Sequence, residues 1–205
     1  MKFIKWKTLI ISCLICLSPI ILGIVLYENL PESMAVHFNF YNEPDNFVSK
    51  GFAVFGIPLL MTFIQIFCCI INDIKVYKHI EYLKFEHIPK WIIPITSIIL
   101  QTSILGYGLG WNIDMRKVAA LIVGAIFLVL GIYIPKLDRI KNFSVDAKKA
   151  LKINKFIGYE MVIMGILMLI TIFLPPITTV IWLFLLIPYT IISVIYGTKV
   201  NRNKE

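Results

Sequence analysis

One polar stretch of the sequence brings together side chains that could bind a metal or change charge near neutral pH. His37 is followed by Glu43 and Asp45, and imidazole and carboxylate groups are common ligands of divalent metals. One histidine and two acids form an incomplete ligand set. We therefore predict no metal and no cofactor here. We expect His37, Asn39 and Asp45 to hold the fold of this stretch by hydrogen bonds.

A second candidate group is an acid inside an apolar run. Glu160 lies near the start of the run at 157–174, and an acid within a membrane span is a functional hypothesis by default. It also lies near a helix N-terminus, where the dipole favours a carboxylate, and Lys155 is close enough to pair with it. We therefore predict a structural role for Glu160.

No pattern typical of an intramembrane hydrolase is present. The sequence contains no HExxH, no GxSxG, no paired intramembrane aspartates and no Ser/Lys arrangement, and such chemistry requires a nucleophile or a metal. Its four cysteines all lie within apolar runs, where they are expected to behave as small buried apolar residues. The sequence predicts a protein that is not an enzyme and has no catalytic residue.

The elements that would position these groups are membrane-spanning helices. Of the 205 residues, 59% are apolar and 16% are charged, whereas soluble domains average about 45–50% and 25%. About 20 apolar residues suffice for a helix to cross a bilayer. Six runs of this kind occur, at residues 8–27, 51–71, 91–111, 118–134, 157–174 and 177–196. We predict an all-α integral membrane protein, a bundle of six transmembrane helices with a structured extracellular loop.

The basic residues predict which side each segment faces. With six spans, alternate segments carry 17 and 3 of the 20 lysines and arginines, and the richer side is cytoplasmic by the positive-inside rule. Both termini are thus expected in the cytoplasm of a cell-membrane protein. Because this charge lies beside lipid, it predicts contact with membrane lipid and no binding of nucleic acid. The segments at 74–90 and 135–156 would be cytoplasmic loops with some amphipathic helical character.

This topology divides the chain into five parts. They are an N-terminal two-helix module at 1–73 with its outer loop at 28–50, a cytoplasmic loop at 74–90, helices three and four at 91–134, a basic cytoplasmic loop at 135–156, and a C-terminal helical hairpin with its tail at 157–205.

Polar and small residues inside the runs predict how the helices pack. We expect hydrogen bonds between helices from Gln65, Gln101, Thr102 and Ser103. Prolines inside spans are tolerated where neighbours satisfy the carbonyls that they leave free. Gly124 with Gly131, and Gly158 with Gly165, are each seven residues apart, a spacing that favours close packing of helices.

The loop at 28–50 is the most specific part of the chain. It has four acids and one lysine, a net charge of −3 in a protein of net charge +8. Residues 34–41 alternate in a way typical of a short strand. A dense turn signal follows at 42–46, where Asn42 can adopt the left-handed conformation.

The loop also resembles a known family. The residues that carry this resemblance are Leu30-Pro31, His37-Phe38-Asn39, Glu43-Pro44-Asp45 and Ser49-Lys50, followed by a helix with Pro58. They are similar to the signature of bacterial membrane proteins of the sporulation-delay killing-peptide immunity (SdpI-like) family, over about residues 20–65. That pattern usually has Gly at the position of Asn42. Its C-terminal signature is largely absent, because the Arg, Trp and His that normally follow a motif like that at 133–137 are missing.

The resemblance implies an immunity or peptide-sensing protein. The outer loop would bind a secreted peptide, and the basic loops would couple to a cytoplasmic regulator. The candidate ligand-binding residues are His37, Phe38, Asn39, Tyr41, Glu43, Asp45 and Lys50. The alternative is a small transporter, or an accessory subunit of a membrane transport complex, which would need polar groups along a continuous path.

Overall fold

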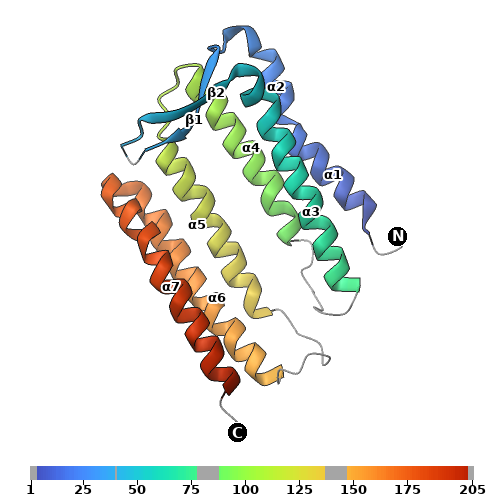
Figure 1. The fold of residues 1–205 in the computed structure, drawn as a ribbon, viewed down its shortest axis with the longest axis vertical. Coiled ribbons are helices and arrows are strands. Elements are labelled where there is room, and N and C mark those ends of the chain that lie inside the picture. Colours follow the sequence, from blue (N-terminus) through green and yellow to red (C-terminus); the bar gives the residue numbers. More distant parts are fainter. Residues whose placement is uncertain (1–3, 40, 78–87, 137–146, 203–205) are drawn as a thin grey trace. The chain divides into compact units, whose positions relative to one another are not determined.

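The computed structural model describes residues 4–39, 41–77, 88–136 and 147–202 (Figure 1). The elements, in chain order, are α1 (Trp6–Leu17), α2 (Pro19–Val25), the 3-10 turn η1 (Tyr27–Asn29), β1 (Ser33–Phe38), β2 (Pro44–Ser49), the π-helical turn η2 (Phe52–Gly56), α3 (Ile57–Tyr77), α4 (Ile88–Gly108), α5 (Met115–Tyr133), the 3-10 turn η3 (Ile134–Lys136), α6 (Ala147–Ile170), the 3-10 turn η4 (Thr171–Phe173) and α7 (Pro176–Arg202).

Five helical segments in the described residues are long and apolar enough to cross a membrane. They are Trp6–Val25, Phe52–Lys75, Ile88–Gly108, Met115–Lys136 and Leu151–Phe173. Large apolar side chains point outward along them, including Leu14, Ile21 and Phe63, each more than half exposed, as expected of surfaces that face lipid. The all-α membrane class is thus confirmed. The sixth expected span coincides with α7, and its crossing stays a prediction.

Several helix limits differ from the apolar runs. The first run is divided at Ser18, since Pro19 begins a new helix. α6 begins at Ala147, ten residues before the fifth run, so a helical extension replaces the later part of the expected loop. α4 begins at Ile88, which places Lys90 in a helix and not in the loop. The amphipathic pattern expected near residue 80 lies outside the described residues.

The chain forms two compact units, residues 1–74 with 87–122 and residues 75–86 with 123–205. In the first unit, α1 and α2 pack against α4, and β1 also packs against α4. The two strands form an antiparallel hairpin at the end of the unit where α4 ends and α3 begins (Figure 1). A buried core that includes Leu30, Met34, Val54, Ile104 and Leu105 joins the hairpin to these helices.

Two glutamine side chains link α4 to η2 and α3. Each glutamine donates a hydrogen bond to a carbonyl that a proline on the other segment leaves free. Pro94 has no N–H for the carbonyl of Lys90 four residues earlier, and Gln65 Nε2 donates to that oxygen at 2.8 Å. In the π-helical turn the carbonyl of Ala53 would bond five residues ahead, where Pro58 has no N–H, and Gln101 Nε2 donates to it at 2.8 Å. The expected interhelical bonds of both glutamines are therefore confirmed.

The prediction of hydrogen bonds between helices was wrong for two hydroxyl residues of α4. Thr102 donates to the carbonyls of Ile98 and Ile99, and Ser103 donates to that of Ile99. Both hydroxyls thus bond within their own helix, which is a common alternative for such side chains inside helices.

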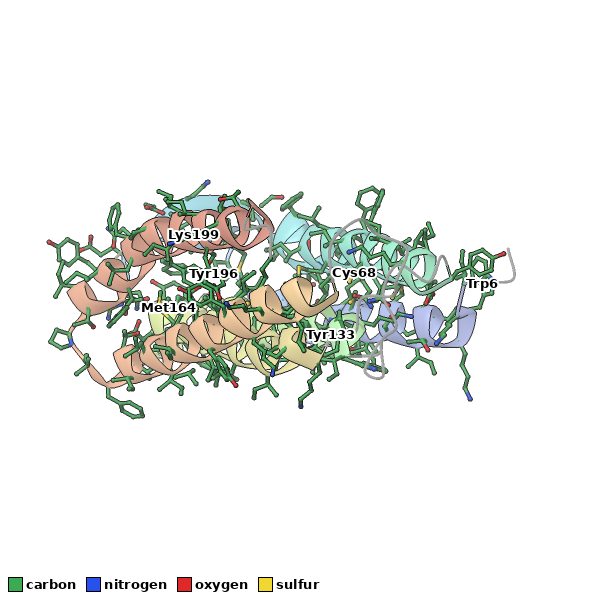
Figure 2. The ribbon with its side chains drawn as sticks, turned by 90° about the horizontal axis from the view of Figure 1, so that it is seen from below. Trp6, Cys68, Tyr133, Met164, Tyr196 and Lys199 are labelled. Carbon is green, nitrogen blue, oxygen red and sulfur yellow. The ribbon has the colours of Figure 1, made fainter. Side chains whose placement is uncertain are left out.

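The second unit contains an antiparallel helical hairpin, as the sequence predicted. The rings of Phe156 and Tyr196 stack with their centroids 4.0 Å apart, and Figure 2 shows Tyr196 on the side of α7 that faces α6. Glu160 of α6 accepts a hydrogen bond from Ser193 of α7 at 2.7 Å. Its described partner is thus this hydroxyl and not Lys155, and it holds the hairpin together.

Glycines allow α5 and α6 to approach closely. A Cβ atom at Gly131 would lie 2.7 Å from the Val162 nitrogen and 2.8 Å from the Gly158 oxygen, and one at Gly165 would lie 2.9 Å from the Gly124 oxygen. Real Cβ atoms do not approach backbone this closely, so the two pairs of glycines confirm the predicted close packing.

Candidate functional site

The candidate site is the hairpin of residues 27–50. Its turn is built around Asn39, whose Oδ1 accepts hydrogen bonds from the amides of Tyr41 and Glu43 at 2.9 and 3.0 Å. The Asn39 Nδ2 donates to Glu43 Oε2 at 2.9 Å. These bonds form a tight turn of the kind that Asn side chains stabilise through their own backbone.

Asn42 joins this turn to the helices. It has a φ of 66°, a conformation that non-glycine residues other than Asn and Asp rarely adopt. Its Oδ1 accepts from the amide of Met115 at 2.8 Å, and its Nδ2 donates to the carbonyl of Ile113 at 3.3 Å. Met115 is the first residue of α5, so Asn42 satisfies an amide that has no partner within that helix.

A charged turn supports the same junction. Burial of Asp114 would raise its pKa, but hydrogen bonds and the charge of Arg116, 2.7 Å away, lower the pKa below its ordinary value. α4 ends at Gly108. Two residues later Gly110 has a φ of +82°, and the amide of Trp111 donates to the Gly106 oxygen at 3.0 Å. This is a common helix ending with glycine in the left-handed conformation.

One face of β1 is fixed to α4. Met34 is 1% exposed and covers Gly108, where a Cβ atom would lie 2.9 Å from the Met34 sulfur. The ring of Phe38 meets that of Tyr107 edge-on with centroids 4.7 Å apart. Phe38, a candidate for ligand contact, is therefore committed to the packing of the hairpin.

A pair of candidate residues links the two strands. His37 Nδ1 and Asp45 Oδ1 are 2.5 Å apart, and both side chains are exposed, by 67% and 43%. Because the imidazole meets this carboxylate across the hairpin, the pair ties the strands together, as expected for a structural role.

Lys50 lies at the base of the hairpin. Its ammonium is 2.8 Å from Glu32 Oε1, bonds to the carbonyl of Leu30 at 3.4 Å, and lies over the ring of Tyr27. The hydrogen bond to Glu32 raises the pKa of Lys50, so the side chain stays charged. With 9% exposure, Lys50 closes the hairpin and offers little surface to a ligand.

The exposed surface of the hairpin is acidic and aromatic. Tyr41 is 65% exposed and Phe47 is 51% exposed, and Glu43 and Asp45 are exposed beside them. Trp111, 62% exposed, lies two residues before the carbonyl that binds Asn42. The candidate residues thus separate into those that build the hairpin and those that remain on its surface.

The apolar runs of the sequence did not predict a buried ion pair between α3 and α4. Lys90 and Asp73 are 0% and 2% exposed, and Lys90 Nζ is 2.5 Å from Asp73 Oδ1. The amide of Lys5 donates to Asp73 Oδ2 at 3.0 Å. The pair therefore joins the start of α1, the end of α3 and the start of α4. An acid and a base at facing ends of consecutive apolar runs were the available signal.

Comparison with known proteins agrees with the resemblance in the loop. Residues 14–62, which contain the whole hairpin, match the family model described as "Domain of unknown function (DUF1648)". The chain is 30% identical over 127 residues, 61% of its length, to "Immunity protein SdpI" of Bacillus subtilis (strain 168), and it spans 58% of that protein. No solved structure matches the chain. The two sequence matches and the apolar helices together show that this chain is a multi-pass membrane protein related to SdpI.

Proposed function

We propose that the protein is a bacterial membrane immunity protein that binds a secreted peptide through the exposed surface of its hairpin. The observation that carries this proposal is that the family match at residues 14–62 coincides with an acidic and aromatic hairpin, while the matched relative is named an immunity protein. The net charge of −3 over residues 28–50 would concentrate a cationic peptide near Tyr41 and Phe47.

The proposal requires the hairpin to lie outside the cell. The division of basic residues supports this orientation, with both termini in the cytoplasm. We expect a cysteine placed at Asn46, an exposed residue, to react with a membrane-impermeant maleimide in intact cells. Labelling only after permeabilisation would contradict the orientation. With this topology the basic segments at 74–90 and 135–156 would be available to a cytoplasmic regulator, and that coupling is part of the proposal.

The function is tested by protection of a sensitive bacterium against the sporulation-delay killing peptide. Glu43→Gln combined with Asp45→Asn removes two charges and leaves amide oxygens that can still accept hydrogen bonds from Asn39 and His37. We expect about a tenfold loss of protection, because steering of a cationic ligand depends on these charges. Raised salt should shrink the difference between the variant and the unaltered protein.

Membrane levels of both proteins, measured after fractionation, control for a loss of insertion. Unchanged protection by the double variant at low salt would contradict electrostatic recognition. Full protection by a chain whose residues 28–50 are replaced with a neutral linker, and which still inserts, would exclude the hairpin as the receptor.

A further inference from the structure

The hairpin has an exposed sheet edge. In the described residues the sheet has two strands, and β1 is the one that packs against α4. In β2, by contrast, Asp45, Asn46, Phe47 and Ser49 are exposed. A strand at the edge of a sheet has outward-facing N–H and C=O groups that can pair with another chain.

The register shows which backbone groups lie on that edge. The amide of Lys50 donates to the carbonyl of Glu32 at 2.9 Å, so these two residues face each other across the hairpin. Hydrogen-bonded and non-hydrogen-bonded pairs alternate along antiparallel strands. Val48, paired with Met34, therefore also faces β1, whereas the backbone groups of Phe47 and Ser49 face away from it.

Only part of this edge is suited to pairing. The register is irregular between Ala35 and Phe38, and Pro44 and Asp45 lie in the corresponding part of β2. Bulges, proline and charge are features that protect sheet edges from association. The regular part, in which residues 33–35 pair with 47–49, has none of these on its outer edge. The pairing edge is therefore the segment 47–49.

We propose that the secreted peptide binds as an added strand along the 47–49 edge of β2, through an extended cationic segment. Addition of a strand uses main-chain hydrogen bonds for affinity and alternate side chains for specificity. The exposed ring of Phe47 would flank the added strand, since side chains of neighbouring strands contact one another. This inference rests on the proposed function and specifies how the peptide is held.

Charge favours a cationic peptide over a second copy of the chain. Two hairpins joined at β2 would bring together two loops that each carry a net charge of −3, and they would repel one another within a Debye length. A cationic strand would instead be attracted to the same loop. The short regular edge is also sufficient for a peptide of a few residues, since strands need only about three residues.

The test uses the full chain in phosphatidylcholine nanodiscs, because a zwitterionic lipid does not itself attract the probe. The probes are a fluorescent peptide of three Lys-Val repeats and the same peptide with every amide N-methylated. N-methylation keeps the charges and side chains but removes the donors. We expect the unmodified peptide to bind at least tenfold more tightly in fluorescence anisotropy. Equal affinities, or no binding by the unmodified peptide, would overturn the proposal.

A pair of variants at Phe47 tests whether the peptide binds at the 47–49 edge. Phe47→Pro removes the outward-facing donor together with the ring, and Phe47→Ala removes the ring alone. We expect the proline variant to bind at least tenfold more weakly than the alanine variant. Hydrogen exchange on the unaltered chain, which does not depend on a variant that folds, should show the amides of Phe47 and Ser49 slowed at least tenfold by the peptide. Unchanged exchange at both amides would contradict strand addition.

The two proposals fail in different ways. If Glu43→Gln with Asp45→Asn weakens protection but N-methylation does not weaken binding, the peptide is held by side chains and only strand addition is wrong. If a chain without the hairpin still protects cells, the proposed receptor function is wrong. Concentration-dependent dimers that protect the amides of Phe47 and Ser49 without peptide would show that a second copy occupies the edge, which overturns the inference.

Discussion

Asp73→Asn should destabilise the first unit by about 3–5 kcal/mol, because it leaves the ammonium of Lys90 buried without a counter-charge. The Lys90 side chain is 0% exposed, and its only described ion-pair partner is 2.5 Å away. The substitution keeps the size of the side chain and removes its charge. The free energy of unfolding, measured by denaturant titration in detergent, should show the loss.

A second variant separates the charge from the volume. Asp73→Leu combined with Lys90→Met replaces the pair by apolar side chains of similar size, and such replacements are often neutral or stabilising. We expect the double variant to recover most of the stability lost in Asp73→Asn. If it is as unstable as the single variant, the unpaired ammonium of Lys90 does not cause the loss in Asp73→Asn, which contradicts the argument.

The matched control is Asp114→Asn. Asp114 also pairs with a basic residue, at 2.7 Å from Arg116, but both side chains are more than a fifth exposed. Ion pairs near water contribute about 0–1 kcal/mol, so this change should cost far less. Similar losses for Asp114→Asn and Asp73→Asn would contradict the argument from burial.

The buried ion pair could not be predicted from the sequence, although the spans around it could. The apolar runs predicted the spans, since a long run without charge has few other stable environments than lipid. In the sequence, Lys90 is indistinguishable from the other basic residues of a cytoplasmic loop. Only the observed start of α4 at Ile88 places it within a helix. The carbonyls left free by Pro58 and Pro94 are predictable from the chain, but their glutamine partners lie on the opposite helix.

The hairpin was also predictable only in part, because its strand and turn depend on local sequence but its packing against the helices does not. Alternation and turn residues are local features of the chain, so the sequence by itself indicates a strand and a turn. Whether Phe38 faces Tyr107 or a ligand depends on how the hairpin docks against α4, which no local pattern encodes. The separation of the candidate residues into structural and exposed groups therefore required the fold.

Asn42 is the residue whose substitution should most strongly uncouple the hairpin from the helices. Asn42→Ala loses both hydrogen bonds to residues 113 and 115. It also places an alanine, whose side chain cannot form a hydrogen bond, at a φ of 66°. Loss of a cap at a helix N-terminus costs about 1 kcal/mol, and the left-handed conformation costs a further 1–2 kcal/mol, roughly. We expect a total loss of about 2–3 kcal/mol in the free energy of unfolding.

Asn42→Gly separates these two contributions, because glycine adopts the left-handed conformation without the steric cost but cannot bond to Ile113 or Met115. It should lose only about 1 kcal/mol, the part that belongs to the cap. Hydrogen exchange of the Met115 amide should become faster in both variants, because this amide loses its partner in each. Protection of cells should fall further with alanine than with glycine. Equal losses for the two variants would show that backbone strain at Asn42 is negligible. If both variants instead retain full stability, the contacts of Met34 and Phe38 hold the hairpin to α4, and apolar packing positions it for its peptide.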